Sequence, residues 1–146
     1  MPLALFDLDN TLLSGDSDHL WGHFLADRGV VDGAAYRRAS DRFYRDYQSG
    51  KLDIFAFLAF SLRPLADHPP ELLAQWHAQF MQECIEPLIG APALNLVEQH
   101  RRAGDTLLII TATNAFVTRP IATRFGIEHL IATEPEQRDG RYTGRV

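Results

Sequence analysis

The sequence Leu3-Ala4-Leu5-Phe6-Asp7-Leu8-Asp9-Asn10-Thr11 joins a short apolar run to two aspartates. Its apolar half does not alternate with polar residues, and it stops abruptly at a pair of aspartates. A short continuous apolar run bounded by turn-forming residues is typical of a strand buried on both faces. We therefore expect an inner strand of a sheet over residues 2–6, with two carboxylates directly after it.

Two further apolar runs indicate more strands of this kind. Residues 106–110 stop at Thr111-Ala112-Thr113-Asn114, and a weaker run covers 129–132. The segments between the runs have helical spacing of apolar residues and end at glycine or proline. Strands connected by helices predict an α/β fold with a parallel sheet. The expected helices cover 18–28, 34–48, 53–62 (ended by Pro64), 71–85, 93–103 and 115–125, and a hairpin turn is expected at 138–142.

The helices between residues 16 and 86 are too many for one crossover between neighbouring strands, so they predict a separate helical cap. We expect residues 1–14 and 87–146 to form the α/β core and residues 15–86 to form the cap. Six aromatic side chains are expected to make the packed core of this cap, and one or two of them could line a substrate pocket. They are Trp21, Phe24, Tyr44, Tyr47, Phe55 and Phe57.

Ligands of an open α/β sheet bind beyond the carboxyl ends of its strands, where both polar clusters fall. Of two carboxylates two residues apart, one can attack as a nucleophile while the other passes a proton to the leaving group. Because like charges this close resist joint ionisation, a cation such as Mg²⁺ is expected beside them. The cluster after residue 110 adds a hydroxyl and backbone N–H groups that suit an anion. Together these groups predict phosphoryl transfer, although aspartates after a strand often only end it.

Two motifs resemble those of the haloacid dehalogenase (HAD) superfamily of phosphatases. Phe6-Asp7-Leu8-Asp9-Asn10-Thr11-Leu12 looks like its first motif, and Ile109-Ile110-Thr111-Ala112-Thr113 looks like its second. The helical insertion after the first motif resembles the C1 cap of subfamily IB, the phosphoserine-phosphatase-like group, which includes histidinol-phosphate phosphatases. Residues 139–146 resemble a hairpin found in that group. The resemblance implies a Rossmann-like HAD sheet, partial in this chain, with an inserted helical cap.

The resemblance also implies roles for individual residues. Asp7 would form an aspartyl-phosphate and bind Mg²⁺ through its carboxylate. Asp9 would be the general acid/base, with its backbone carbonyl on the metal. Thr111 would hold the transferring phosphoryl group, together with the backbone N–H groups of Leu8, Asp9 and Ala112. Asp16 falls where phosphoserine phosphatases read the substrate amine, although the residues around it, 14–18, depart from the phosphoserine pattern.

The chain departs from the family pattern at its C-terminal side. The family's third motif supplies a lysine and its fourth supplies carboxylates for Mg²⁺, and both lie downstream of the hairpin. The one lysine, Lys51, falls between two expected cap helices. We therefore expect the N-terminal part of a longer phosphatase, poorly active alone. Its first strand would have an unpaired apolar edge that invites self-association.

Composition excludes several classes of function. A formal net charge of -5, with 13 arginines and one lysine among 14 basic residues, argues against nucleic acid and anionic membranes as partners. A single cysteine, Cys84, excludes an internal disulfide and suggests a reducing compartment. No targeting or spanning segment is visible, so a cytoplasmic protein is expected. His19 and His23 have a zinc-like spacing but lack a third ligand at suitable spacing.

Three functions remain open from the sequence. The first is a Mg²⁺-dependent phosphomonoesterase acting on a small phosphorylated metabolite, since a cap that closes over the site limits substrate size. The second is an inactive, phosphatase-like binding module that keeps the phosphate cradle. The third is a phosphotransferase that passes the phosphoryl group from Asp7 to an alcohol. The sequence does not identify which metabolite is the substrate.

Overall fold

The computed structural model describes residues 2–146 of the chain. These residues form two compact units. One unit contains the residues up to Leu20 together with Trp76–Glu134, and the other contains Trp21–Gln75 together with Pro135–Val146. The functional division into a core over 1–14 and 87–146 and a cap over 15–86 stays a prediction.

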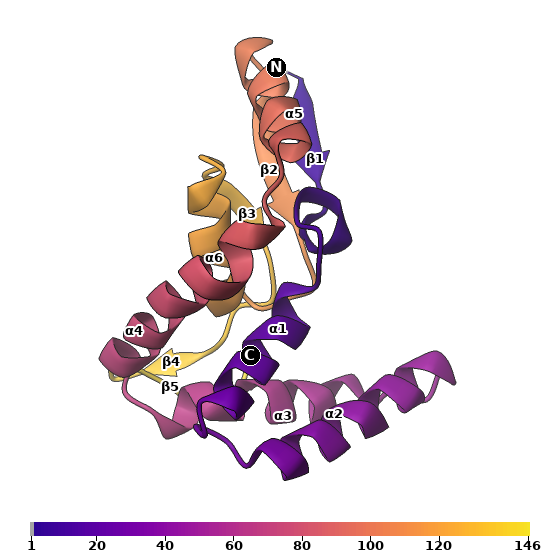
Figure 1. Ribbon diagram of the computed structural model, residues 1–146, viewed down its shortest axis with the longest axis vertical. Helices are drawn as coiled ribbons and strands as arrows, with labels where there is room; N and C mark the ends of the chain where they lie inside the picture. The colour runs from indigo at the N-terminus through magenta and orange to yellow at the C-terminus, as the bar shows by residue number, and fades with distance from the viewer. Residues whose placement is uncertain (1) are drawn as a thin grey trace. The chain divides into compact units, whose positions relative to one another are not determined.

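The elements follow the expected order of strand, helical insertion, helix, strand, helix, strand and hairpin (Figure 1). Short helical turns follow β1 and α4. In chain order, the elements are β1 (Leu3–Phe6), η1 (Leu8–Leu12), α1 (Ser17–Asp27), α2 (Gly33–Gln48), α3 (Ile54–Asp67), α4 (Pro70–Phe80), η2 (Met81–Ile85), η3 (Glu86–Leu88), α5 (Ala91–Arg102), β2 (Thr106–Ile110), α6 (Ala115–Arg124), β3 (His129–Ile131), β4 (Gln137–Arg138) and β5 (Arg141–Tyr142).

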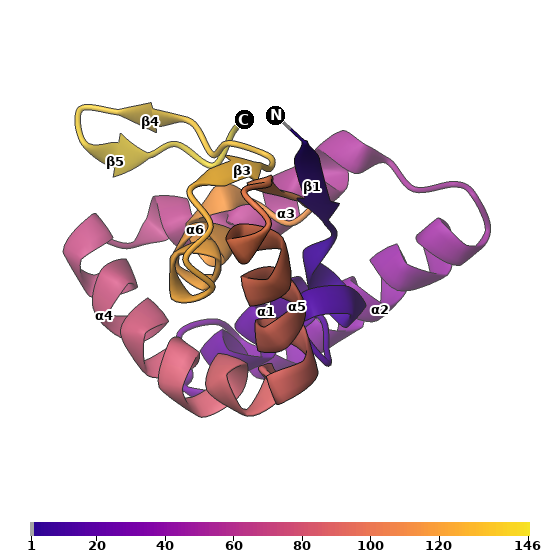
Figure 2. The same ribbon diagram turned by 90° about the horizontal axis from the view of Figure 1, so that it is seen from above.

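A parallel three-stranded sheet in the order β1-β2-β3 forms the centre of the first unit, which confirms the predicted fold class. Ala4 pairs with Leu107 and Phe6 with Ile109, and all four side chains are buried on one face. Figure 2 shows α5 and α6 on the same side of the strands. Because β1 and β2 pair in parallel, their carboxyl ends lie side by side at one edge of the unit.

The prediction that the first strand is buried on both faces is wrong for this chain. Burial alternates along β1, and the side chains of Leu3 and Leu5 are more than half exposed. Ile110 and Ile131, at the ends of β2 and β3, are exposed as well. A continuous apolar run therefore marks a strand whose second face stays uncovered by residues 2–146.

Two helices and a hairpin dominate the second unit. α2 begins at the cap residue Asp32 and packs on α3 through aromatic rings. The ring of Phe43 lies 5.7 Å from that of Phe57 and 5.2 Å from that of Phe60. The expected hairpin is present: β4 and β5 are antiparallel, joined by Asp139 and Gly140, which both have positive φ, as a two-residue hairpin turn requires.

Two expectations for the helical segment are corrected. Pro64 does not end the third helix, because α3 continues to Asp67 with Pro64 and Leu65 buried. Burial of the Pro64 ring offsets part of the free energy that the missing backbone hydrogen bond costs. The predicted aromatic core holds for Trp21 and Phe24, which are buried, and in part for the half-buried Phe57. It is wrong for three side chains that the structure exposes, which are Tyr44, Tyr47 and Phe55.

Within residues 2–146, each helix is too short or too polar to cross a lipid bilayer.

Candidate active site

The first carboxylate leaves the sheet directly after β1. Asp7 is exposed, and its Oδ1 accepts a 2.8 Å hydrogen bond from the backbone N–H of Leu8. The chain then turns sharply through η1, where Asn10 has φ 58 and the N–H of Leu13 donates to the carbonyl of Leu8. Asparagine tolerates this left-handed backbone. The turn places Asp7 at the carboxyl end of β1, where α/β proteins bind ligands.

Asp9 is held by four donors from two separate segments. Its Oδ1 accepts from the backbone N–H of Ser17 at 2.8 Å and from the Ser17 hydroxyl at 2.6 Å. Its Oδ2 accepts from the Thr113 hydroxyl at 2.8 Å and from the Thr111 hydroxyl at 3.5 Å. The Ser17 side chain is fully buried. Charge-assisted bonds of this kind fix the orientation of the carboxylate.

The second polar cluster begins where β2 ends. Thr111 is buried, its N–H donates to the carbonyl of Ile131, and its hydroxyl accepts from the N–H of Thr113 at 3.1 Å. Asn114 then caps α6 by accepting from the N–H of Val117. The structure confirms the expectation that the clusters after β1 and β2 meet. Thr113, rather than Thr111, makes the shorter contact with Asp9.

Two more carboxylates lie at the start of α1. Asp16 Oδ1 accepts from the N–H groups of Asp18 and His19 at 3.0 and 3.2 Å, so Asp16 stabilises the first turn of the helix. Asp18 is half-buried. Burial, reinforced by the carboxylates of Asp16 and Asp9, raises the pKa of Asp18 to about 6. The start of α1 is therefore a place where negative charge accumulates beside Asp9.

The donors near the turn suit a hard cation only in part. Carboxylate and carbonyl oxygens of Asp7 and Asp9 are ligands that Mg²⁺ prefers, and Mg²⁺ keeps several waters of its own. Within residues 2–146, however, no three His, Cys, Asp or Glu side chains are arranged to hold a metal. Asp7 and Asp9 thus fit the role of partial ligands.

Comparison with known proteins settles the family. The model of the haloacid dehalogenase-like hydrolase family matches residues 4–146. This chain belongs to that family. The resemblance seen in the two motifs is thereby confirmed.

Several HAD relatives resemble this chain over nearly its whole length. A histidinol-phosphatase from Neisseria meningitidis serogroup C (strain 8013) is 50% identical over 97% of this chain and 64% of its own length. The phosphoserine phosphatase SerB1 of Mycobacterium tuberculosis (strain ATCC 25618 / H37Rv) is 29% identical over 98% of this chain and 47% of its own length. The chain thus spans less than two thirds of the length of either curated relative.

Solved structures share the HAD fold. A Bordetella pertussis Tohama I protein of unknown function is 50% identical, with a TM-score of 0.93 over 99% of this chain and 65% of that one. A substrate-bound phosphoserine phosphatase is 17% identical, with a TM-score of 0.64 over 99% of this chain and 61% of its own. At that identity the likeness shows the fold alone.

The HAD motifs do not reveal every residue that shapes this site. Ser17 and Thr113 hold Asp9, yet neither was singled out from the sequence. Thr113 could have been found, since it belongs to the same polar cluster after β2 and lies two residues after Thr111. Ser17 has no sequence signal, because its contact depends on how the chain returns after η1.

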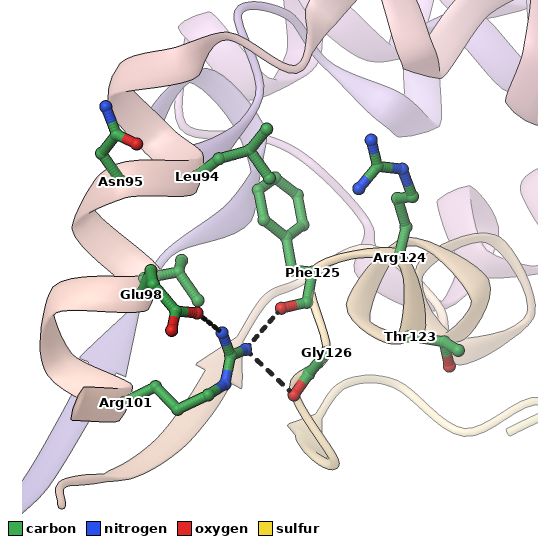
Figure 3. Close-up of a pocket in the computed structure, with 9 residues that line it drawn as sticks. Leu94, Asn95, Glu98, Arg101, Thr123, Arg124, Phe125 and Gly126 are labelled. Carbon is green, nitrogen blue, oxygen red and sulfur yellow. Dashed lines mark hydrogen bonds and ion pairs between the residues drawn. The ribbon is translucent and has the colours of Figure 1, made fainter.

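A surface hollow of about 500 Å³ lies elsewhere in the same unit, between α5 and the end of α6 (Figure 3). Arg101 crosses it, donating to the carbonyls of Phe125 and Gly126 and pairing with Glu98. These bonds satisfy carbonyls at the helix end. None of the predicted site residues lines this hollow, and its arginine is engaged in holding α6 to α5.

Proposed function

We propose that this chain carries the catalytic carboxylates of a Mg²⁺-dependent phosphomonoester hydrolase. One observation carries the proposal: Asp9, two residues after Asp7 at the end of β1, is held by hydroxyls from the end of β2 and from the start of α1. A carboxylate oriented by four donors beside a second, exposed carboxylate suits acid/base work next to a nucleophile. Membership of the HAD family supports the same reading.

In this proposal each of these residues has a role in one step of the hydrolysis. An Asp7 oxygen attacks phosphorus, and the bond from phosphorus to the substrate oxygen breaks while Asp9 gives that oxygen a proton. Water then attacks phosphorus while Asp9 takes a proton from it, the bond from phosphorus to the Asp7 oxygen breaks, and inorganic phosphate and the free Asp7 carboxylate result. The Thr111 hydroxyl and the N–H groups of Leu8, Asp9 and Ala112 hold the phosphoryl oxygens. Since the Leu8 N–H donates to Asp7 in this structure, it must change partner when phosphate binds.

Mg²⁺ would be held by the carboxylate of Asp7 and the backbone carbonyl of Asp9. When bound, it would offset the charge shared by the phosphoryl group and the carboxylates. This arrangement lets an anionic carboxylate approach an anionic phosphate, which otherwise repel each other.

Histidinol phosphate is the first substrate to test, because a relative 50% identical to this chain is a histidinol-phosphatase. Phosphoserine is the second. Asp16 and Asp18 at the start of α1 would favour a substrate that carries a positive charge, which both compounds do. We further propose that the substrate is a small phosphorylated metabolite and that the protein is cytoplasmic.

Beryllofluoride, a mimic of the aspartyl-bound phosphoryl group, tests the nucleophile. We expect a Mg²⁺-dependent ¹⁹F NMR signal from the 146-residue chain, lost in Asp7→Asn and kept in Ser14→Ala, a matched control at an exposed residue. A signal that survives Asp7→Asn, or its absence from the wild type, contradicts the proposed role of Asp7.

Turnover separates the three functions that the sequence leaves open. Phosphate released from histidinol phosphate with Mg²⁺, and abolished by Asp7→Asn, supports the hydrolase. Phosphate found on an added alcohol instead indicates a phosphotransferase. Beryllofluoride binding without any turnover favours the second candidate, a phosphate-binding module. That candidate gains support from the metal ligands, since among the described residues no three His, Cys, Asp or Glu side chains are arranged to hold a metal.

A further inference from the structure

α3 is a helix without a polar face in its first half. Residues 54–62 contain no charged side chain, and apolar residues occur all round the helix. Such a helix is normally buried on every side. Here Leu62 is buried, and Phe57 and Phe60 pack against the ring of Phe43 on α2, while the side chains of residues 54–56 and 59 stay exposed. α2 covers little more, because none of its own residues is buried.

Four large side chains remain exposed where α2 ends and α3 begins. On α2, Tyr44 is 61% exposed and Tyr47 is 68% exposed. On α3, Ile54 is 49% exposed and Phe55 is 77% exposed. We call these four residues the hairpin tip. Tyr44 and Tyr47 are three apart and so lie on one face of α2, while Ile54 and Phe55 form the first turn of α3, just beyond the connecting loop 49–53.

Charges around the hairpin tip are of both signs. Asp41, Arg42 and Arg45 are exposed on the last turns of α2, and Lys51 and Asp53 are exposed in the connecting loop. In a two-fold interface each surface meets its own copy, so a surface of one sign repels itself while a mixed one can match itself. The mixture therefore suits a second copy of the chain better than a strongly charged partner such as nucleic acid or an anionic membrane.

The area of the hairpin tip also suits a dimer. An aromatic side chain buries about 150–250 Å² when covered, so at their exposed fractions the four residues offer roughly 500 Å² per copy. A two-fold pair that covers all of this area would bury about 1,000 Å², the size of a weak, reversible interface. We propose that the hairpin tip is a self-association surface, through which two copies of this chain bind each other.

Sedimentation of the 146-residue chain tests this surface. We expect a monomer–dimer equilibrium whose dissociation constant rises at least tenfold in the double variant Tyr47→Ser, Phe55→Ser, because removing interface aromatics commonly has effects of this size. Leu96→Ser is the matched control, since Leu96 is an exposed apolar residue of α5. Far-UV circular dichroism checks that each variant keeps its helices.

Photo-crosslinking provides a readout that does not depend on truncated side chains. A benzoylphenylalanine in place of Tyr47 should yield a covalent dimer of twice the 16.5 kDa chain mass, and the same probe at Leu96 should not. A chain that stays monomeric and does not crosslink at Tyr47 overturns the proposal. So does a dimer that survives the tip variant but dissociates in Leu5→Lys, which would assign self-association to the edge of β1.

Discussion

At the scale of single residues, the Asp9 carboxylate organises the candidate site. Ser17 and Thr113 donate to different oxygens of this one group, so the two contacts are expected to be coupled. We expect Ser17→Ala and Thr113→Val each to lower the free energy of unfolding by about 1.5–3 kcal/mol, the usual cost of removing a hydrogen bond to a charged group. Chemical denaturation of the 146-residue chain measures this.

The double variant distinguishes a shared role from two independent ones. If both hydroxyls act through Asp9, the loss in Ser17→Ala, Thr113→Val differs from the sum of the single losses by at least about 0.5 kcal/mol. Ser14→Ala, at an exposed serine of the same segment, should change little. Strict additivity of the two losses would mean that Asp9 does not couple them.

The carboxyl group of Asp18 should make the free energy of unfolding depend on pH. Its pKa is raised to about 6 by burial and by the carboxylates of Asp16 and Asp9, so the folded state binds a proton more tightly than the unfolded state does. This group therefore destabilises the fold at neutral pH, and that effect disappears as the pH falls from about 6 to about 4. We expect Asp18→Asn to be more stable than the wild type at pH 7, by roughly 1–3 kcal/mol.

Comparison of pH series isolates this effect from other carboxylates. The stability difference between Asp18→Asn and the wild type should shrink between pH 6 and pH 4, as followed by urea unfolding. Asp41→Asn, at an exposed aspartate of α2, serves as the control and should show no such trend. An equal difference at pH 4 and pH 7 would mean that the Asp18 carboxyl does not titrate in this range.

Part of this site is predictable from the sequence, for a physical reason. Asp7, Asp9 and Thr111 follow apolar runs, and parallel strands bring their carboxyl ends together, so pattern alone predicts that Asp9 meets the 111–114 cluster. Ser17 and Asp18 reach Asp9 through the irregular turn after β1, which depends on the left-handed Asn10. Pattern contains no information about such a turn. The roles of these residues in catalysis stay predictions.

At the scale of elements, α4 and α6 are joined by a buried histidine. His77 Nε2 lies 2.9 Å from the carbonyl oxygen of Val117, and its ring lies edge-on to Phe80 and Phe116. Burial lowers the pKa of His77, so the folded state resists protonation. The fold should therefore lose stability as the pH falls through the ordinary range of histidine, near 6.5.

His77→Gln tests this contact, because glutamine keeps an N–H donor for Val117 but cannot titrate. We expect thermal unfolding of the wild type to drop more steeply between pH 7 and pH 5 than that of His77→Gln. His129→Gln, at an exposed histidine of β3, is the control and should follow the wild type. Parallel curves for His77→Gln and the wild type would contradict the role assigned to burial.

Elements were more predictable than their surroundings. Residues 106–110 form β2 as expected, because a run of branched apolar residues favours a strand. The predicted end of the third helix was wrong. Proline normally ends a helix, whereas α3 continues to Asp67 with Pro64 buried inside it. The predicted burial of β1 and of the aromatic side chains was wrong for a different reason. An apolar pattern shows that a face needs a partner, but it does not show whether these 146 residues supply one.

At the scale of the whole molecule, two apolar surfaces lie open. The hairpin tip is one, and the outer face of the sheet, with Leu3, Leu5, Ile110 and Ile131, is the other. Within residues 2–146, β1 is also an edge strand, since it pairs with β2 alone. An apolar edge strand promotes aggregation, and a contiguous exposed apolar face is rare in stable monomers. We therefore expect the 146-residue chain to bind hydrophobic dyes and to aggregate as its concentration rises.

Leu5→Lys should reduce both effects, because it places a charge in the middle of the exposed face and beside the open edge. We expect dye fluorescence to fall at least roughly twofold and the concentration at which light scattering begins to rise. Leu96→Lys, which removes an exposed leucine on α5, controls for the added charge. Since Leu5 is exposed, the helical circular dichroism signal should persist. Unfolding of Leu5→Lys would instead mean that Leu5 is buried in solution, and that the outer face of the sheet is covered by a further contact between copies.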